Sequence, residues 1–304
     1  GGRMFELRRL RMLHELALRG TLASVAEALS YAPSTISQQL AQLEQEAGVA
    51  LLAPDGRRVR LTEQGRLLAA HAAEALDADE RVRGELETLR VGGAPVVRVA
   101  VMQTAASALV PHALSLLAER TPALQVEVAE LPPEEGLFEL TARRYDLVVA
   151  EQYPGHTRAH AAGHVRSPLG RDPIRLAQPP GRPPARLAEL ADRAWVMEPR
   201  GTAAREWAVQ QCRAAGFEPR VPFELADLGA HVGLIAAGHA VGMLPDLVFA
   251  PTLGIRPSAL TLTALEGSPA REVFVAMRRS SDARPSVAAT AQALTDAFAE
   301  RTGA

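Results

Sequence analysis

Lysine is absent from this chain, and cysteine occurs once, at Cys212. A single cysteine excludes an intrachain disulfide and any redox switch built from a cysteine pair. All 33 basic residues are arginines, a bias that indicates a GC-rich genome more than a function. Because 35 carboxylates outnumber them, the formal net charge is -2, and the chain as a whole is not a basic nucleic-acid binder.

Long apolar runs are also missing. No uninterrupted apolar stretch reaches the roughly 18 residues of a membrane-spanning helix, and the charged N-terminal segment does not resemble a signal peptide. We therefore expect a cytoplasmic protein without a membrane partner. The 304 residues, 47% of them hydrophobic, predict two or three domains with sizeable cores, although aromatic residues make up only 4%.

Sequence patterns typical of enzymes do not occur either. No GxSxG, HExxH or GxxxxGK(S/T) motif is found, so we expect no enzyme, no catalytic residue and no cofactor. His156, His160 and His164 recur at every fourth residue, a spacing that would suit a metal site on a helix. Because proline and glycines interrupt this segment and no cysteine is near, we expect no metal there.

Residues 21–44 contain two short helical patterns separated by a break at residues 30–32. Apolar residues recur at gaps of three and four in both patterns, at Leu22, Val25, Ala26 and Leu29 and then at Ile36, Leu40 and Leu43. Pro33 suits the first position of the second helix, where a missing N–H costs nothing. This arrangement predicts a helix-turn-helix, although an ordinary pair of amphipathic helices is the alternative.

The second helix of this pair carries neutral polar side chains, which can read base edges in the major groove. We predict that the DNA-reading residues are Ser34, Thr35, Ser37, Gln38, Gln39 and Gln42.

Residues 51–61 predict a β-hairpin, because Asp55-Gly56 is a strong turn signal. Val59 and Leu61 alternate with Arg58 and Arg60, so the two arginines share the solvent face. We predict a wing whose phosphate-binding residues are Arg57, Arg58 and Arg60; a solvated loop is the alternative. Residues 1–66 hold nine Arg and seven carboxylates, so a local basic patch must supply the DNA affinity.

A long helix follows the hairpin, from a cap at Thr62 to about residue 91. Gaps of four and three form a seam typical of a coiled coil, at Leu68, Ala72, Ala75, Asp79, Val82, Leu86 and Leu89. Five charges are expected on its exposed side, namely Asp77, Glu80, Arg81, Glu85 and Glu87. The pattern favours a dimerisation helix, with packing on its own domain as the alternative.

Beyond a break at residues 92–95, strands and helices alternate. The expected strands 96–102, 124–131 and 145–150 and helices 107–120 and 134–144 imply a mostly parallel sheet. A second α/β unit begins near residue 171, and a strand at 271–278 and a helix at 286–301 return to the first. Two crossings between two lobes predict a clamshell like that of periplasmic binding proteins.

Small ligands bind such folds between the lobes, at strand ends and helix starts. The residues at these positions, and our predicted effector-binding set, are Gln103, Thr104, Glu151, Gln152, Arg200, Gly201, Thr202 and Asp227. Helix N-termini and Arg200 would suit an anionic effector, but the acidic residues leave its charge open. The alternatives are that Thr202 only caps its helix and that Arg200 makes a surface ion pair.

Residues 4–91 resemble the N-terminal part of a LysR-type transcriptional regulator. The matching residues are Leu7, Leu10 to Leu16, Ala26, Leu29, Ser37, Leu43, Glu44, Gly48, Leu51, Leu52, Leu61, Thr62 and Gly65. The family usually has Gln, Arg and Phe where this chain has Pro33, Pro54 and Leu52, so more of the DNA reading falls to Gln38 and Gln39.

The resemblance implies a regulator of transcription that binds double-stranded promoter DNA and a small-molecule effector. It also implies a homodimer or homotetramer and is compatible with a contact to RNA polymerase. The fold expected is α/β overall: a winged helix-turn-helix at 4–61, a linker helix at 62–91, and an effector domain at 95–304, with lobe I at 95–167 and 268–304 and lobe II at 168–267. A transporter's solute-binding protein is the alternative, which the N-terminal winged helix disfavours.

Overall fold

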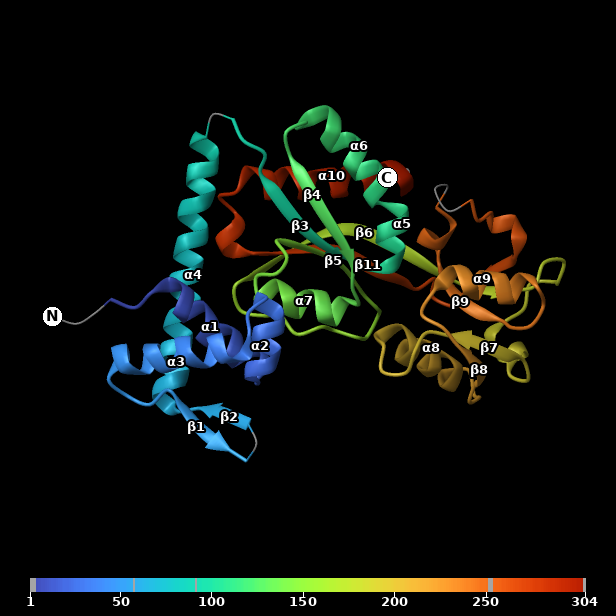
Figure 1. Ribbon diagram of the computed structural model, residues 1–304. Coiled ribbons are helices and arrows are strands. Elements are labelled where there is room, and N and C mark those ends of the chain that lie inside the picture. Colours follow the sequence, from blue (N-terminus) through green and yellow to red (C-terminus); the bar gives the residue numbers. More distant parts are fainter. Residues whose placement is uncertain (1–3, 57, 91, 251–253, 303–304) are drawn as a thin grey trace. The chain divides into compact units, whose positions relative to one another are not determined.

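The computed structural model describes residues 4–56, 58–90, 92–250 and 254–302 (Figure 1). It divides into two compact units. The N-terminal unit comprises Gly1–Arg90 together with Ser280–Arg284, and the C-terminal unit comprises Val91–Arg279 and Pro285–Ala304.

The N-terminal unit is a three-helix core followed by a hairpin and a long helix. Its elements are α1 (Leu7–Arg19), α2 (Leu22–Leu29), α3 (Pro33–Ala47), β1 (Leu52–Asp55), β2 (Arg58–Leu61) and α4 (Glu63–Leu89). Thr21 caps α2 by accepting the N–H of Ser24 at 3.1 Å, and Ser30 ends it with a φ of 57°. Leu13, Ile36 and Leu40 are fully buried between the helices. The predicted helix-turn-helix and hairpin are therefore confirmed.

The start of α4 lies directly against the strand that leads into the hairpin. Thr62 Oγ1 accepts the N–H of Gly65 at 2.9 Å and donates to the carbonyl of Ala50 at 2.8 Å. A Cβ added to Gly65 would stand 2.1 Å from the carbonyl oxygen of Leu51. Only glycine therefore allows this approach, which fixes the hairpin relative to α4.

The two halves of α4 have different surroundings. Leu68, Ala72 and Ala75 pack on the core of the unit, whereas Val82, Leu86 and Leu89 are 53%, 59% and 78% exposed. The first half of α4 therefore packs on its own domain, as in the alternative to a dimerisation helix. Its second half carries an apolar stripe without a partner among the described residues.

The middle of α4 is held by Ser280–Arg284, a segment of the same unit. The expectation that Glu80 is exposed was wrong: it is buried and accepts the hydroxyl hydrogens of Ser280 at 2.6 Å and Ser281 at 2.9 Å. Arg284 lies 3.6 Å from the carboxylate of Glu87. Helical periodicity could not show this, because the partners lie about 200 residues further along the chain.

The C-terminal unit has two α/β lobes. The first lobe contains β3 (Val96–Val101), α5 (Gln103–Ala108), α6 (Val110–Arg120), β4 (Gln125–Glu130), α7 (Pro133–Thr141), β5 (Leu147–Gln152) and α10 (Pro285–Thr302). The second contains η1 (Leu187–Leu190), β7 (Ala194–Met197), α8 (Ala203–Ala214), β8 (Arg220–Glu224), α9 (Leu228–Ala236), β9 (Gly242–Pro245), η2 (Asp246–Phe249), η4 (Pro257–Ala259) and β10 (Thr261–Ala264).

Two long strands, β6 (His164–Gln178) and β11 (Ala270–Arg278), connect the lobes. The sheet order is β10-β6-β11-β5-β3-β4, with β9 also paired to β6. Strands β3, β4 and β5 are parallel as predicted, whereas β6 and β11 are antiparallel to their neighbours. One end of β6 pairs with β11, and the other pairs with β9 and β10. A single strand therefore runs through both lobes.

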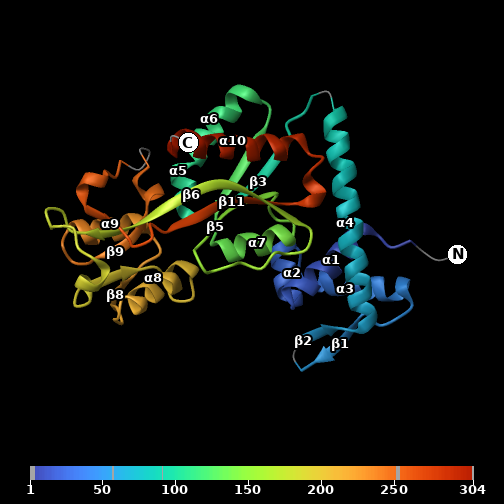
Figure 2. The same cartoon turned by 180° about the vertical axis from the view of Figure 1, so that it is seen from behind.

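Alternate residues of the first-lobe strands face opposite helix layers. Val99, Val101 and Val149 pack in the cluster that includes residues of α5, α6 and α10, whereas Ala100 and Val148 pack with Leu140 of α7. The helices α6 and α10 and the helix α7 lie on opposite sides of the sheet (Figure 1, Figure 2). Both faces of β3 and β5 are thus covered, which explains why most of their residues are apolar.

We predict that Gly65→Ala destabilises the N-terminal unit by about 1–3 kcal/mol, because the added methyl group must displace the Leu51 backbone. Thermal unfolding followed by circular dichroism would measure the loss. Gln64→Ala, at the exposed neighbouring position, is the matched control and should change little. Equal unfolding midpoints for the two variants would contradict the close approach.

Candidate functional site

The exposed face of α3 is narrower than its sequence predicted. Ser34, Ser37 and Gln38 are exposed, and Thr35 is half-buried. Gln39 is not free, because its Oε1 accepts the Nε hydrogen of Arg9 at 2.9 Å.

The flank of α3 next to Gln39 forms a small polar network with α1. Arg9 also contacts Glu46 at 2.6 Å, and Gln42 donates to Glu46 at 3.4 Å. Gln39 and Gln42 thus join this network, which leaves Ser34, Ser37 and Gln38 as the exposed polar set among those predicted to read DNA.

The hairpin after α3 presents arginines on one face. Arg58 and Arg60 are exposed on β2, whereas Val59 is half-buried on the other side. Neither arginine has an ion-pair partner among the residues that the structure describes, so both guanidinium groups can meet phosphate. Arg57, also predicted to contact phosphate, lies outside the described residues.

A cleft of about 330 Å³ lies between the two lobes of the C-terminal unit. Four predicted effector-binding residues contribute to its lining, namely Gln103, Thr104, Glu151 and Thr202. They come from α5, β5 and the start of α8, at strand ends and helix starts as expected.

A direct bridge closes one side of this cleft. Gln103 Nε2 donates to Asp227 Oδ1 at 2.6 Å, and the N–H of Leu228 donates to Gln103 Oε1 at 3.2 Å. Helix α5 begins at Gln103 itself rather than near Ser107, which turns this side chain toward the second lobe. Asp227 therefore acts by joining the lobes and also caps α9 through the N–H of Gly229.

A buried ion pair forms the base of the cleft. Arg271 on β11 is 4% exposed; its Nε donates to Asp172 on β6 at 2.8 Å and its Nη2 donates to Thr104 Oγ1 at 2.7 Å. Asp172 also accepts the N–H of Leu247 at 3.0 Å. Burial alone would lower the pKa of Arg271, but Asp172, Tyr153 and Glu151 together outweigh it and hold this pKa above its usual range.

The sequence prediction missed Arg271 and Asp172. The sequence did contain a signal for this pair: Arg271 and Asp172 each lie within a segment that forms a buried strand. Because a buried charge needs a partner of opposite charge, the two residues could have been expected to pair.

The segment that follows β5 folds back over Glu151. Arg158 Nε donates to the Glu151 carbonyl at 2.8 Å, and its Nη2 lies 3.4 Å from the Glu151 carboxylate. Arg158 also pairs with Glu134 of α7. Gln152 accepts the N–H of Arg158 at 3.4 Å instead of lining the cleft. Burial raises the pKa of Glu151 in spite of the nearby arginines.

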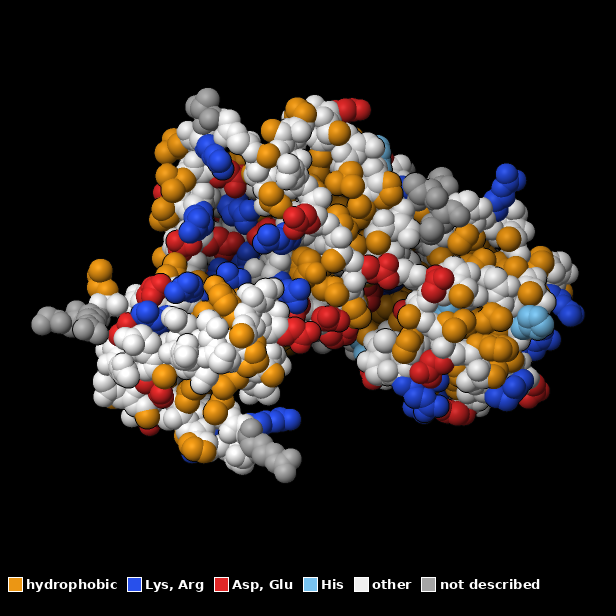
Figure 3. Space-filling model, in the orientation of Figure 1, with side chains coloured by type: hydrophobic (Ala, Val, Ile, Leu, Met, Phe, Trp, Pro, Cys, Tyr) orange, Lys and Arg blue, Asp and Glu red, His pale blue; other side chains and the backbone are white. Residues whose placement is uncertain are grey.

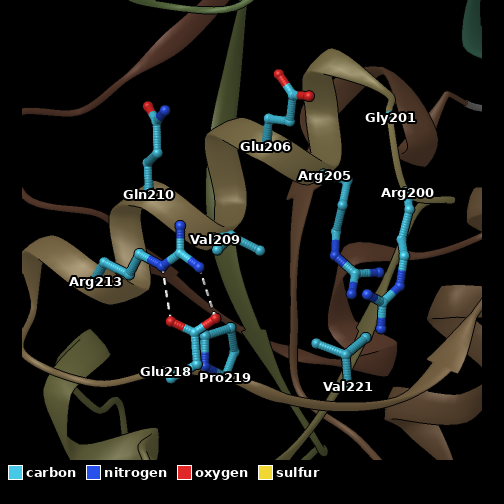
Figure 4. A pocket seen from close by; sticks show the side chains of 10 residues that line it. All are labelled: Arg200, Gly201, Arg205, Glu206, Val209, Gln210, Arg213, Glu218, Pro219 and Val221. Atoms are coloured by element: carbon cyan, nitrogen blue, oxygen red, sulfur yellow. Dashed lines mark hydrogen bonds and ion pairs between the residues drawn. The ribbon is translucent and has the colours of Figure 1, made fainter.

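Arg200 and Gly201 do not line the cleft between the lobes. They line a separate groove of about 430 Å³ along α8 (Figure 4). The Arg200 side chain is 83% exposed and lies 3.5 Å from Glu224, so the surface ion pair is the correct interpretation. Thr202 both caps α8, by accepting the N–H of Arg205 at 3.2 Å, and lines the cleft.

Glu198 lines the cleft although it was not predicted to do so. It directly follows the last residue of β7, Met197. Burial, followed by the charge of Glu151, raises the pKa of Glu198 to about 7. No described side chain donates a hydrogen bond or pairs with its carboxylate.

The three spaced histidines do not lie on a helix. His164 begins β6 and contacts Thr141 Oγ1 at 3.1 Å, and His156 lies 3.8 Å from Glu206. Within the described ranges no group of three or more His, Cys, Asp or Glu side chains is arranged to hold a metal ion. The described helices include none that is long and apolar enough to cross a membrane.

A winged helix-turn-helix followed by a long helix and a two-lobed domain with a cleft defines a DNA-binding regulator with a ligand-binding module. Comparison with known families agrees. Residues 7–66 match the bacterial regulatory helix-turn-helix protein, lysR family, and residues 91–299 match the LysR substrate binding domain. The chain belongs to the LysR family of transcriptional regulators, whose members are not enzymes.

Individual relatives cover most of the chain. It is 30% identical to the transcriptional dual regulator GltC of Bacillus subtilis, over 81% of this chain and 83% of GltC. It is 24% identical to the dual regulator OxyR of Escherichia coli, over 95% and 94%. A full-length OxyR variant from Pseudomonas aeruginosa has the same fold, with a TM-score of 0.68 and 20% identity over 99% of this chain and 97% of that one.

We predict that Arg271→Ala destabilises the C-terminal unit by about 3–5 kcal/mol, because it leaves Asp172 buried without its partner. Urea unfolding would measure this. Arg213→Ala, which breaks an exposed pair with Glu218, is the control and should change the free energy of unfolding little. If Arg271→Ala is no more costly than Arg213→Ala, the pair does not hold the lobes.

Proposed function

We propose that this regulator reads promoter DNA with α3 and the β1–β2 wing, under the control of a small molecule bound in the cleft. The observation that carries the proposal is an exposed, uncharged polar face on α3 together with two exposed wing arginines, Arg58 and Arg60, that form no ion pair with any described residue. The polar face suits base edges, and the arginines suit phosphates. We place the protein in the cytoplasm with the DNA and assign it no catalytic role.

Within this proposal the residues have separate tasks. Ser34, Ser37 and Gln38 contact base edges, and Arg58 and Arg60 contact the backbone. The polar network of Gln39 and Gln42 with Arg9 and Glu46 holds α3 against α1, which supports a rigid reading head. Pro33, without an N–H or a polar side chain, adds no hydrogen bond at the helix start.

The cleft supplies the control. Gln103 joins the lobes through Asp227 and Leu228, so a ligand that touches both lobes stabilises the closed arrangement. A ligand with different affinities for closed and open lobes shifts the population between them, and only such a ligand can change DNA binding. We propose that Gln103, Thr104, Glu151 and Thr202 face the effector.

Peroxide is not the effector in this proposal, although similar proteins from mycobacteria are named probable hydrogen peroxide-inducible genes activators. Cys212 is fully buried on α8, and burial raises its pKa to about 12. The reactive thiolate is therefore disfavoured. The chain also has no second cysteine to form a disulfide.

Two copies of the chain are proposed to pair through the second half of α4. Val82, Leu86 and Leu89 form one exposed stripe with gaps of four and three, which suits a partner helix. Pairing doubles the basic wing patch and so raises DNA affinity. The proposed boundaries remain 4–61 for the DNA-binding domain, 62–91 for the linker helix and 95–304 for the effector domain.

We predict opposite signatures for two DNA-binding variants. Gln38→Ala should change the preference among DNA sites, with a loss of about 1–3 kcal/mol at the base pair that Gln38 reads. Arg58→Ala should weaken binding to all sequences alike and lower the salt dependence by about one counterion. Fluorescence anisotropy on a panel of single-base variants of a bound site, at several salt concentrations, would separate the two.

Gln42→Ala is the control for Gln38→Ala, since Gln42 bonds to Glu46 within α3. If the preference among base pairs is unchanged in Gln38→Ala but lost in Gln42→Ala, the face of α3 that we assign to base contacts is wrong. Binding without any base preference at moderate salt would contradict the proposed function.

We predict that Leu86→Asp shifts the protein toward the monomer, because it places a charge in the apolar stripe of α4. Sedimentation velocity would measure the assembly state. Ala70→Asp adds the same charge at an exposed position on another side of α4 and should leave it unchanged. An unaltered assembly state in Leu86→Asp would show that the stripe is not an interface.

A further inference from the structure

The cleft between the lobes has an acidic excess. Four carboxylates line it, from Glu130, Glu134, Glu151 and Glu198, against two guanidinium groups, from Arg158 and Arg271. Figure 3 shows acidic side chains over α7 and toward α9, on the face that the two lobes share. The pairing of these groups determines which charge the cleft presents to an effector.

Both arginines are already neutralised within the protein. Arg271 is buried and bonded to Asp172 and Thr104. Arg158 is paired with the carboxylates of Glu134 and Glu151. An anionic ligand would have to displace one of these carboxylates, at the cost of leaving it without its cation.

The helix starts at the cleft are partly occupied by bonds within the protein. Thr202 Oγ1 accepts the N–H of Arg205 at the start of α8, and Gln103, the first residue of the short α5, is bonded to Asp227.

Glu198, unlike the two arginines, has no partner of opposite charge among the described residues. Its half-buried carboxylate receives no hydrogen bond and no ion pair from any described residue. Burial and then the charge of Glu151 raise its pKa, although the charge of Arg271 lowers it. A cation that approaches from the cavity would satisfy such a carboxyl group. The same cavity also presents hydrocarbon surface from Leu131, Pro132 and Leu228.

We propose that the effector carries a protonated nitrogen group, such as an ammonium or guanidinium, which binds Glu198 beside Glu151 while its hydrocarbon part packs against Leu131, Pro132 and Leu228. A volume of about 330 Å³ suits a metabolite rather than a peptide or a larger cofactor. This inference rests on the proposed function of the cleft and adds the chemical class of its ligand.

A matched set of linear probes tests the charge directly. Putrescine and agmatine carry only cationic ends, whereas succinate has the putrescine backbone length with two carboxylates. Isothermal titration of the full chain should show binding of at least one amine with a Kd at or below about the millimolar range, and no binding of succinate. Binding of succinate, or of neither amine, would overturn the proposal.

Variants locate the binding group. Glu198→Gln keeps the size of the side chain but removes its charge and should weaken amine binding at least about tenfold. Glu266→Gln, an exposed carboxylate outside the cleft lining, is the matched control and should leave the affinity unchanged. Equal affinity in wild type and Glu198→Gln would refute the assignment, and thermal unfolding would verify that both variants are folded.

The dependence of amine affinity on pH distinguishes a direct contact with Glu198 from a purely structural role of this residue. Because the pKa of Glu198 is raised, its charge is lost as the pH falls below neutrality, and amine affinity should drop from about pH 8 to about pH 6. This drop should be smaller in Glu198→Gln. An equal drop in both proteins would count against Glu198.

Failure of this inference and failure of the proposed function give different results. If succinate binds in the cleft and alters DNA affinity, the amine class is wrong but the ligand-controlled regulator stands. If an amine binds through Glu198 but leaves DNA affinity unchanged, the class is right and the proposed control of DNA binding is wrong.

Discussion

The buried pair of Arg271 and Asp172 is the interaction on which the C-terminal unit depends. It joins the two strands that connect the lobes, β11 and β6, and it reaches α5 through Thr104 and η2 through the N–H of Leu247. Two charges away from water are tolerated only when each meets its partners closely, as here. Four elements are therefore fixed around one point, and the cleft opens directly above it.

This fixed point also determines the electrostatics of the cleft. Asp172 pairs with Arg271, and Glu134 and Glu151 pair with Arg158, whereas Glu198 has no ion pair with any residue that the structure describes. The lobes meet through Gln103 at one side, so occupation of the cleft and closure of the lobes are physically linked. In the N-terminal unit, Gly65 gives the wing a similarly fixed position against α4.

Local patterns predicted most of the elements, because apolar periodicity and caps act over a few residues. The helix-turn-helix, the wing, the long helix and the parallel strands β3, β4 and β5 all follow from such patterns. The sequence placed the start of the second α/β unit near residue 171 and did not predict the full length of β6, because Pro168, Gly170 and Pro173 interrupt its pattern. Long-range partners explain the other differences: Glu80 with Ser280, Gln39 with Arg9, Arg200 with Glu224, and Arg271 with Asp172.

We propose that two copies of this chain together read a defined DNA sequence with α3. Selection of bound duplexes from a randomised pool by the full chain, followed by sequencing, would test this. We expect enrichment of an inverted repeat, since paired chains present two equivalent DNA-binding domains to the duplex. A pool that stays random after repeated selection, although the chain retains DNA, would contradict it.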